Sequence, residues 1–171
     1  MKFLKLIPIF IFFGILPLSN IVYSQSESPK AYKVLSSKNK KLSISNVQAY
    51  LAQGDKFIEN GDFEKAKETF DRARELAKKL AGFYMDLNSS FKGIDARVPL
   101  EMENKGRESI KIWAESSSRL ASLYIRKKQP EVAVPLLVEI IRLMSPNSPK
   151  GKEAYEDLIK LGFVDTSYKG F

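Results

Sequence analysis

The feature that most constrains the fold is a stripe of apolar residues spaced three and four apart between Phe63 and Phe91. This spacing places side chains along one face of an α-helix. The stripe consists of Phe63, Ala66, Phe70, Ala73, Ala77, Leu80, Tyr84, Leu87 and Phe91. A helix over this span is about 45 Å long at 1.5 Å per residue. Because each large apolar side chain contributes about 1.5–3 kcal/mol when buried, we expect the whole stripe to lie against neighbouring helices.

Four further helices are expected, and no segment has the alternation of a strand. The five expected helices cover about 46–59, 63–91, 95–128, 130–144 and 149–161. Ser45, Asp62 and Ser148 are suited to be N-caps, and the third helix begins near Asp95 or Pro99. Short breaks between long helices favour antiparallel packing. The sequence therefore predicts an all-α fold of about five antiparallel helices with two elongated central helices.

The N-terminal segment has the pattern of a secretory signal. Two lysines, Lys2 and Lys5, precede an apolar run from Leu6 to Leu18, which is too short to span a bilayer comfortably. We expect export with cleavage near Ser24, and an uncleaved N-terminal anchor is the alternative. The expected organisation is a signal peptide over 1–24, a flexible basic leader over 25–44, the helical domain over 45–162 and a C-terminal tail over 163–171.

The composition excludes several kinds of chemistry. The chain has no Cys and no His, which removes zinc and thiolate sites of the usual kinds, a Cys nucleophile and a His general base. Its carboxylates mostly alternate with Lys and Arg, and Trp113 lies in the apolar stripe of the third helix, where a core position is expected. We therefore expect no enzyme, no cofactor and no metal site. The net charge of +8 favours weak contact with anionic surfaces but does not indicate nucleic-acid binding.

Residues 50–73 carry a motif of helical repeat proteins. The motif consists of Tyr50, Gly54, Phe57, Gly61, Asp62, Phe63, Ala66, Phe70 and Ala73. In type and spacing these residues resemble one tetratricopeptide repeat. A weaker repeat covers about 117–140, where Leu120, Ala121, Tyr124, Ala133, Leu137 and Ile140 agree but the turn Lys128-Gln129-Pro130 lacks glycine. The resemblance implies a repeat-like helical hairpin, with the extra length in the two central helices.

A looser resemblance concerns the cellular location. Gly93-Ile94-Asp95, Gln129 to Ile141 and Leu161 to Thr166 look similar to stretches of an uncharacterised family of exported helical proteins from photosynthetic bacteria. That resemblance implies the periplasm or the thylakoid lumen.

The tetratricopeptide resemblance also implies a binding groove on the inner faces of the first helix of each pair. On this chain the groove would include Gln48, Leu51, Asp55, Ile58, Glu59, Glu115, Ser118, Ser122, Ile125 and Arg126. Exposed Leu51, Ile58 and Ile125 would anchor an extended peptide or a helix. Alternatively, these three residues pack against the leader or the tail.

The expected function is that of an exported, non-enzymatic protein-protein interaction module, in the role of an assembly or scaffolding factor. The alternative is a peripheral structural protein held to an anionic membrane or wall polymer by Lys38, Lys40, Lys41, Arg126, Lys127 and Lys128. The sequence leaves the partner protein and the oligomeric state open.

Overall fold

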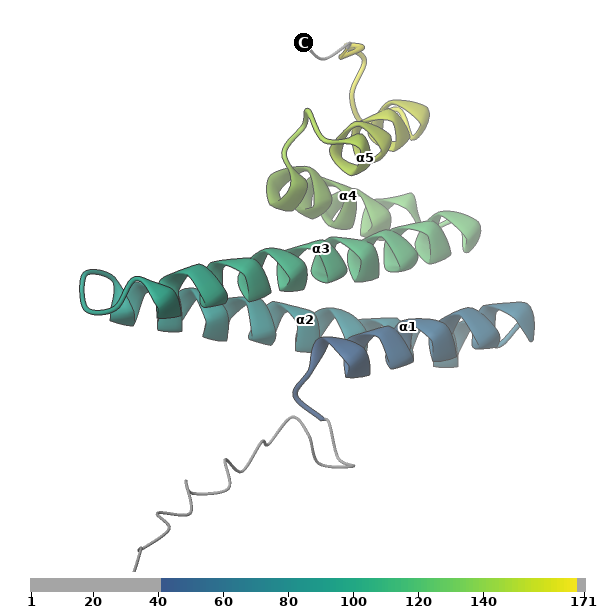
Figure 1. The fold of residues 1–171 in the computed structure, drawn as a ribbon. Helices are drawn as coiled ribbons and strands as arrows, with labels where there is room; N and C mark the ends of the chain where they lie inside the picture. The colour runs from purple at the N-terminus through teal and green to yellow at the C-terminus, as the bar shows by residue number, and fades with distance from the viewer. Residues whose placement is uncertain (1–40, 169–171) are drawn as a thin grey trace, which may run out of the picture. The chain divides into compact units, whose positions relative to one another are not determined.

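The computed structural model describes residues 41–168 and folds them into five α-helices without a strand in this range. The helices are α1 (Ile44–Glu59), α2 (Phe63–Phe91), α3 (Arg97–Arg126), α4 (Pro130–Met144) and α5 (Pro149–Lys160) (Figure 1). The predicted all-α fold of about five helices is confirmed, and α2 and α3 are the two elongated helices, with 29 and 30 residues. The predicted signal peptide, its cleavage site and the leader up to residue 40 lie outside the described residues.

The two long helices form an antiparallel hairpin. At one end, Lys127, the residue that follows α3, pairs with Glu64 of α2. At the other end, the side-chain amide of Asn88 donates to the carbonyl of Pro99 at 2.9 Å. The helix α3 starts at Arg97, between the two predicted starts, and Asp95 accepts from the Arg97 backbone N–H at 2.9 Å.

The helix α1 packs on the first half of this hairpin. It begins two residues earlier than predicted, because Ser43 and not Ser45 is the N-cap that accepts from the Asn46 backbone N–H. The turn to α2 places Gly61 at a φ of +77°, a conformation that glycine adopts without strain. Asp62 caps α2 as predicted. The core between α1, α2 and α3 is built of Val47, Leu51, Ala66, Phe70, Ala73, Ala77, Leu80, Ile112, Leu120 and Leu123.

The helices α4 and α5 continue the stack on the other side of α3. A second core joins them through Ala114, Ala121, Ala133, Leu137, Ile140, Ala154 and Leu158. Apolar residues surround much of α4, so its sequence alone predicts the most buried helix of the five, and this prediction is wrong. Only three of its residues are buried, and Val132 and Val138 are 37% and 45% exposed. Two small neighbouring faces, from α3 and α5, do not enclose a helix with apolar residues on most of its surface.

The first residues of the tail fold back only in part. Val164 packs on the second core, whereas Phe163 is 58% exposed. The Tyr155 hydroxyl donates to the Thr166 carbonyl at 2.8 Å and so holds the tail beside α5. Across the described range, each helix is too short or too polar to be a membrane span.

Candidate interaction surface

The predicted groove is crossed by a chain of ion pairs that links α1, α3 and α5. Arg119 of α3 contacts Asp55 of α1 at 3.0 Å and also pairs with Glu115. Glu115 in turn accepts from Lys150 of α5 at 2.6 Å. Burial alone would raise the pKa of Glu115, but Lys150 and Arg119 outweigh it and hold that pKa below its usual value. The charged groups at the centre of this face therefore already have intramolecular partners.

The structure divides the predicted groove into two hollows. One, of about 370 Å³, includes Gln48, Leu51 and Glu115 in its lining, and the other, of about 80 Å³, includes Ile58, Ser122 and Arg126. Asp55 lies between them along α1. The remaining predicted residues join neither hollow: Glu59 is exposed at the end of α1, while Ser118 and Ile125 are half-buried on α3.

Two of the three predicted apolar anchors are not available to a ligand in this groove. Leu51 is only 7% exposed, because it follows Val47 by one helical turn and both side chains face the hairpin. Ile125 packs against the core of α4 and α5, on a different side of α3. Ile58 is half-buried against the first core. The expectation of three exposed apolar anchors is therefore wrong, and ion-paired side chains occupy the centre of the groove.

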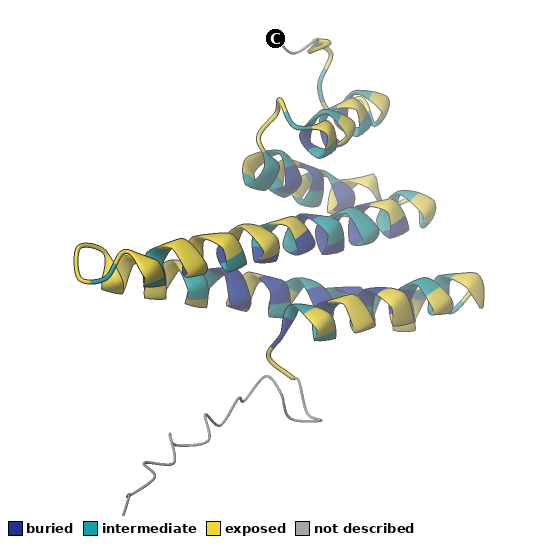
Figure 2. Cartoon of the chain, viewed as in Figure 1, coloured by how far each residue is buried: buried dark blue, intermediate teal, exposed yellow. Residues whose placement is uncertain are grey.

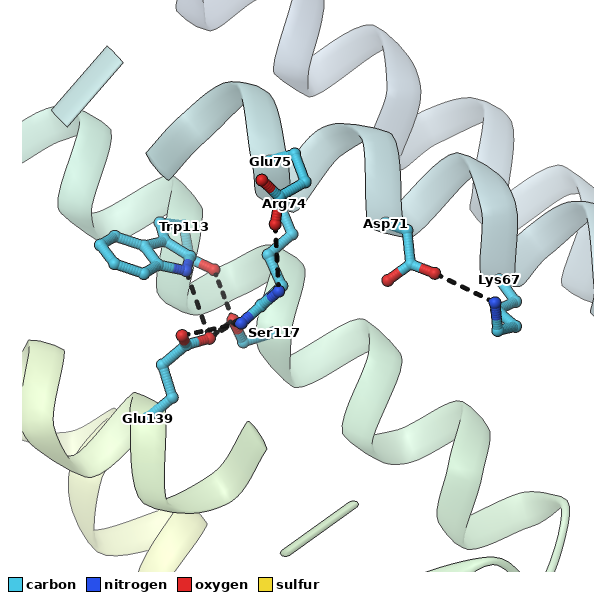
Figure 3. Close-up of polar contacts among 7 residues, drawn as sticks. All are labelled: Lys67, Asp71, Arg74, Glu75, Trp113, Ser117 and Glu139. Carbon is cyan, nitrogen blue, oxygen red and sulfur yellow. Dashed lines mark hydrogen bonds and ion pairs between the residues drawn. The ribbon is translucent and has the colours of Figure 1, made fainter. Parts of the chain in front are cut away.

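A half-buried carboxylate joins α2, α3 and α4. Glu139 of α4 accepts four hydrogen bonds (Figure 3). Two come from the guanidinium of Arg74 at 2.9 and 2.8 Å, in a bidentate arrangement. The others come from the Trp113 indole at 3.2 Å and the Ser117 hydroxyl at 2.8 Å. A hollow of about 520 Å³ adjoins this cluster, with Tyr124 and Arg142 among its lining residues.

The contacts of Glu139 make it a structural residue. Burial by itself raises its pKa, but Arg74, Ser117 and Trp113 together hold that pKa below its usual value. A carboxylate that stays ionised and already accepts four hydrogen bonds is poorly suited to take up a proton in catalysis. Glu139 and Arg74 were not among the residues predicted from the sequence. The available signal was the single acidic residue, Glu139, within the otherwise apolar run from Val132 to Ile141.

The free end of the α2–α3 hairpin extends beyond the other helices (Figure 1). The level along the hairpin at which this extension begins is given by the start of α1. There, Ile44 lines a hollow together with Glu108 and Ile112 of α3. Gly106 lies against Tyr84 at this level. The parts of α2 after Tyr84 and of α3 before Gly106 therefore extend past α1. We call residues 83–107 the overhang.

Most of the overhang is exposed (Figure 2). It carries the largest group of exposed apolar side chains among the described residues. Their exposed fractions are 47% for Phe83, 59% for Met85, 43% for Leu87, 37% for Phe91, 77% for Ile94 and 62% for Leu100. The prediction that the whole stripe of the second helix is buried is thus wrong at its end. The stripe continues to Phe91, but α1 covers it only to about Leu80.

Three of these side chains, Phe83, Leu87 and Phe91, form what we call the apolar row. They follow Leu76 and Leu80 at steps of three and four, so all five lie along one side of α2. Leu76 and Leu80 pack in the core that α1 closes. The apolar row therefore extends the surface of α2 on which α1 lies. Met85 faces a different side, where it lines a hollow of about 390 Å³ with Met102 and Ile110.

Comparisons of the chain with protein-family models, with curated proteins and with solved structures found no match. The described residues also contain no group of three or more acidic side chains placed to hold a metal ion. The overhang and the ion-paired groove are thus the two candidate interaction surfaces of the described residues.

Proposed function

We propose that this protein is an exported, non-enzymatic interaction module that binds another polypeptide through the apolar row of its overhang. The observation that carries the proposal is the continuation of the α1-binding side of α2 by Phe83, Leu87 and Phe91, with no helix of the described domain on them. The predicted groove has a smaller part in this function, because its central charges are paired within the chain.

The shape of the surface suits a helical ligand. The part of α2 that lies before the row already holds a helix, α1, through Val47 and Leu51. A ligand helix in line with α1 would meet apolar side chains at the same steps of three and four. Burying the exposed parts of three large side chains gives a few kcal/mol before the cost of association, at about 25 cal/mol per Å².

The electrostatic alternative has less support from the described residues. Of the basic run Arg126, Lys127 and Lys128, Lys127 is paired with Glu64. Lys38 and Lys40 lie outside the described range. The overhang contains four basic and four acidic residues, so its formal charge is zero while the whole chain carries +8. A neutral apolar surface favours a polypeptide over an anionic polymer as its ligand.

A site-specific photo-crosslinker tests this function. The crosslinker replaces Phe83 in one version of the chain and Val138 of α4 in the other, because both positions are similarly exposed, at 47% and 45%. We expect a discrete crosslinked polypeptide from position 83 that disappears when Leu87→Asp is added, and no such product from position 138. Equal crosslinking from both positions, or none from position 83, would contradict the proposal.

Export is a separate part of the proposal, and it is tested on the N-terminus. Mass spectrometry of the chain from the exported fraction should find Gln25 as the first residue. Recovery of the chain only from the cytoplasm, with residues 1–24 intact, would remove this part and leave the binding proposal in place.

A further inference from the structure

We propose that the polypeptide bound by the apolar row is a second copy of this chain, whose α2 lies antiparallel on the first. This inference rests on the proposed function and names its partner. The direction of the second α2 follows from the helix that this side of α2 already binds. The helix already bound to this side of α2 is α1, and α1 runs antiparallel to α2 across the short turn at Gly61. The α2 helix of a second copy, entering from the free end, has that same direction.

The row is self-complementary under a twofold axis. Leu87 is its midpoint, and Phe83 and Phe91 lie four residues to either side. An axis through Leu87 therefore brings the two Leu87 side chains together and sets Phe83 of each copy against Phe91 of the other. Such an isologous contact closes on itself and gives a dimer. Each aromatic pair adds about 0.5–1.5 kcal/mol beyond its buried area.

The space beside the row matches the length that a second α2 needs. From Phe83 to Phe91 the rise is about 12 Å at 1.5 Å per residue. Beyond this length the second copy reaches its own loop, where Ile94 is 77% exposed. That loop then lies near the start of α1 of the first copy, where Leu42 is 40% exposed. The same contact thus covers two further apolar side chains on each copy.

The charges of the overhang allow two identical surfaces to meet. The overhang is formally neutral, with four basic and four acidic residues. Its ion pairs Glu101–Lys105 and Asp95–Arg97 are made within one copy, at 2.5 and 2.7 Å. Like charges therefore do not oppose the contact, whereas the bodies of two chains at +8 each would repel one another elsewhere.

The exposed apolar area is in the range that a stable dimer needs. Phe83, Leu87, Phe91, Ile94 and Leu42 are 47%, 43%, 37%, 77% and 40% exposed. At about 200 Å² for a fully exposed side chain of this size, they expose roughly 500 Å² per copy. One side of a standard interface buries about 800 Å², of which about 57% is apolar, or roughly 450 Å².

Sedimentation equilibrium of the full chain, purified as its expression host processes it, tests the stoichiometry. We expect a monomer–dimer equilibrium, a monomer for Leu87→Asp, and an unchanged dimer for the control Val138→Asp, whose site on α4 is 45% exposed. Circular dichroism establishes that both variants keep their helices. A monomer for the unaltered chain at all concentrations up to about 100 µM, or the same mass for both variants, refutes the second copy.

Disulfide formation tests the register, because the chain has no cysteine of its own. Leu87→Cys should crosslink to itself under mild oxidation. Phe83→Cys should not, because about 12 Å separates the two copies of that position, far beyond the Cβ separation of a disulfide. A mixture of Phe83→Cys and Phe91→Cys chains should crosslink again. Self-crosslinking of Phe83→Cys as fast as Leu87→Cys overturns the antiparallel register.

The two proposals fail in different ways. If the chain is a monomer but the photo-crosslinker at position 83 still captures a different polypeptide, the second copy is refuted and the interaction function stands. If position 83 captures nothing and the chain is a monomer, both are refuted.

Discussion

Gly54 in the middle of α1 provides a test of the packing between α1 and α2. A Cβ atom at this position would lie 2.3 Å from Cε1 and 2.6 Å from Cδ1 of Phe70, where ordinary contacts are 3.4–4 Å. The Phe70 ring would have to move by more than about 1 Å, yet Phe70 is only 1% exposed and closely surrounded. We therefore expect Gly54→Ala to strain the core.

The matched control is Gly82→Ala in the interior of α2, where an added Cβ has nothing within 4 Å. Both substitutions gain about 0.8–1 kcal/mol of helix propensity. Overpacking a core costs about 1–3 kcal/mol. We expect Gly82→Ala to raise the free energy of unfolding by up to about 1 kcal/mol. The free energy of unfolding of Gly54→Ala should be about 1–3 kcal/mol lower than that of Gly82→Ala.

Urea unfolding followed by circular dichroism measures both values, with the fluorescence of Trp113 as a second probe of the same transition. All variants are compared at one protein concentration, because self-association adds a concentration-dependent contribution to stability. If Gly54→Ala and Gly82→Ala agree within about 0.5 kcal/mol, the close contact between α1 and Phe70 does not exist as described.

Three further predictions concern the carboxylate cluster and the overhang. Glu139→Ala should lower the free energy of unfolding by about 2–3 kcal/mol in urea unfolding, because it leaves half-buried donors such as Arg74 unpaired. The exposed Glu75→Ala should change it by less than about 0.5 kcal/mol. Since the folded pKa of Glu139 lies below its ordinary value of 4.5, its stabilisation is present above that pH and is lost as the pH falls through the folded pKa. The free energy of unfolding of Glu139→Gln should therefore depend less on pH in the acid range than that of the unaltered chain. An unchanged pH dependence would contradict the ionised, hydrogen-bonded state of Glu139. Leu80→Ala should lower the free energy of unfolding by about 2–5 kcal/mol, because Leu80 is buried. Leu87→Ala should lower it by less than about 1 kcal/mol at a concentration where the chain is monomeric. Equal losses for the two variants would mean that the apolar row is covered within one chain.

Burial of the exposed apolar row is the driving force by which the overhang would bind a polypeptide. Isolated apolar residues are common on protein surfaces, but a row that continues a helix-binding side of α2 is not accounted for by chance exposure. The same row is an aggregation hazard for a monomer at high concentration, which a closed twofold contact removes.

Helix positions were predictable because their signals are local. The stripe from Phe63 to Phe91 and the cap at Asp62 place α2 within the sequence, and the structure agrees at both ends. The fifth helix was equally clear from Ser148, Pro149 and Gly162, whose φ is +71°. Where two nearby serines compete as N-cap, as Ser43 and Ser45 do, the sequence gives little reason to choose, and α1 was placed two residues late.

The polar cluster at Glu139 was not predictable to the same degree. Its partners Arg74, Trp113 and Ser117 lie 65, 26 and 22 residues away in the chain. No periodicity of a single helix relates them, since they meet only where three helices cross. Trp113 did lie in the predicted stripe of α3, but the stripe does not reveal that its indole N–H would find a carboxylate.

By itself the sequence determined the helices, their order and the absence of cysteine and histidine chemistry, because caps, breaks and apolar steps act over a few residues. The tertiary structure alone decided which parts of each stripe are covered. Leu51 and Phe91 both lie on apolar stripes, yet Leu51 is 7% exposed and Phe91 is 37% exposed. The difference depends on where α1 begins relative to α2, which is a matter of helix length and register between separate elements. That register buries Leu51 of the predicted groove and leaves the end of the α2 stripe exposed.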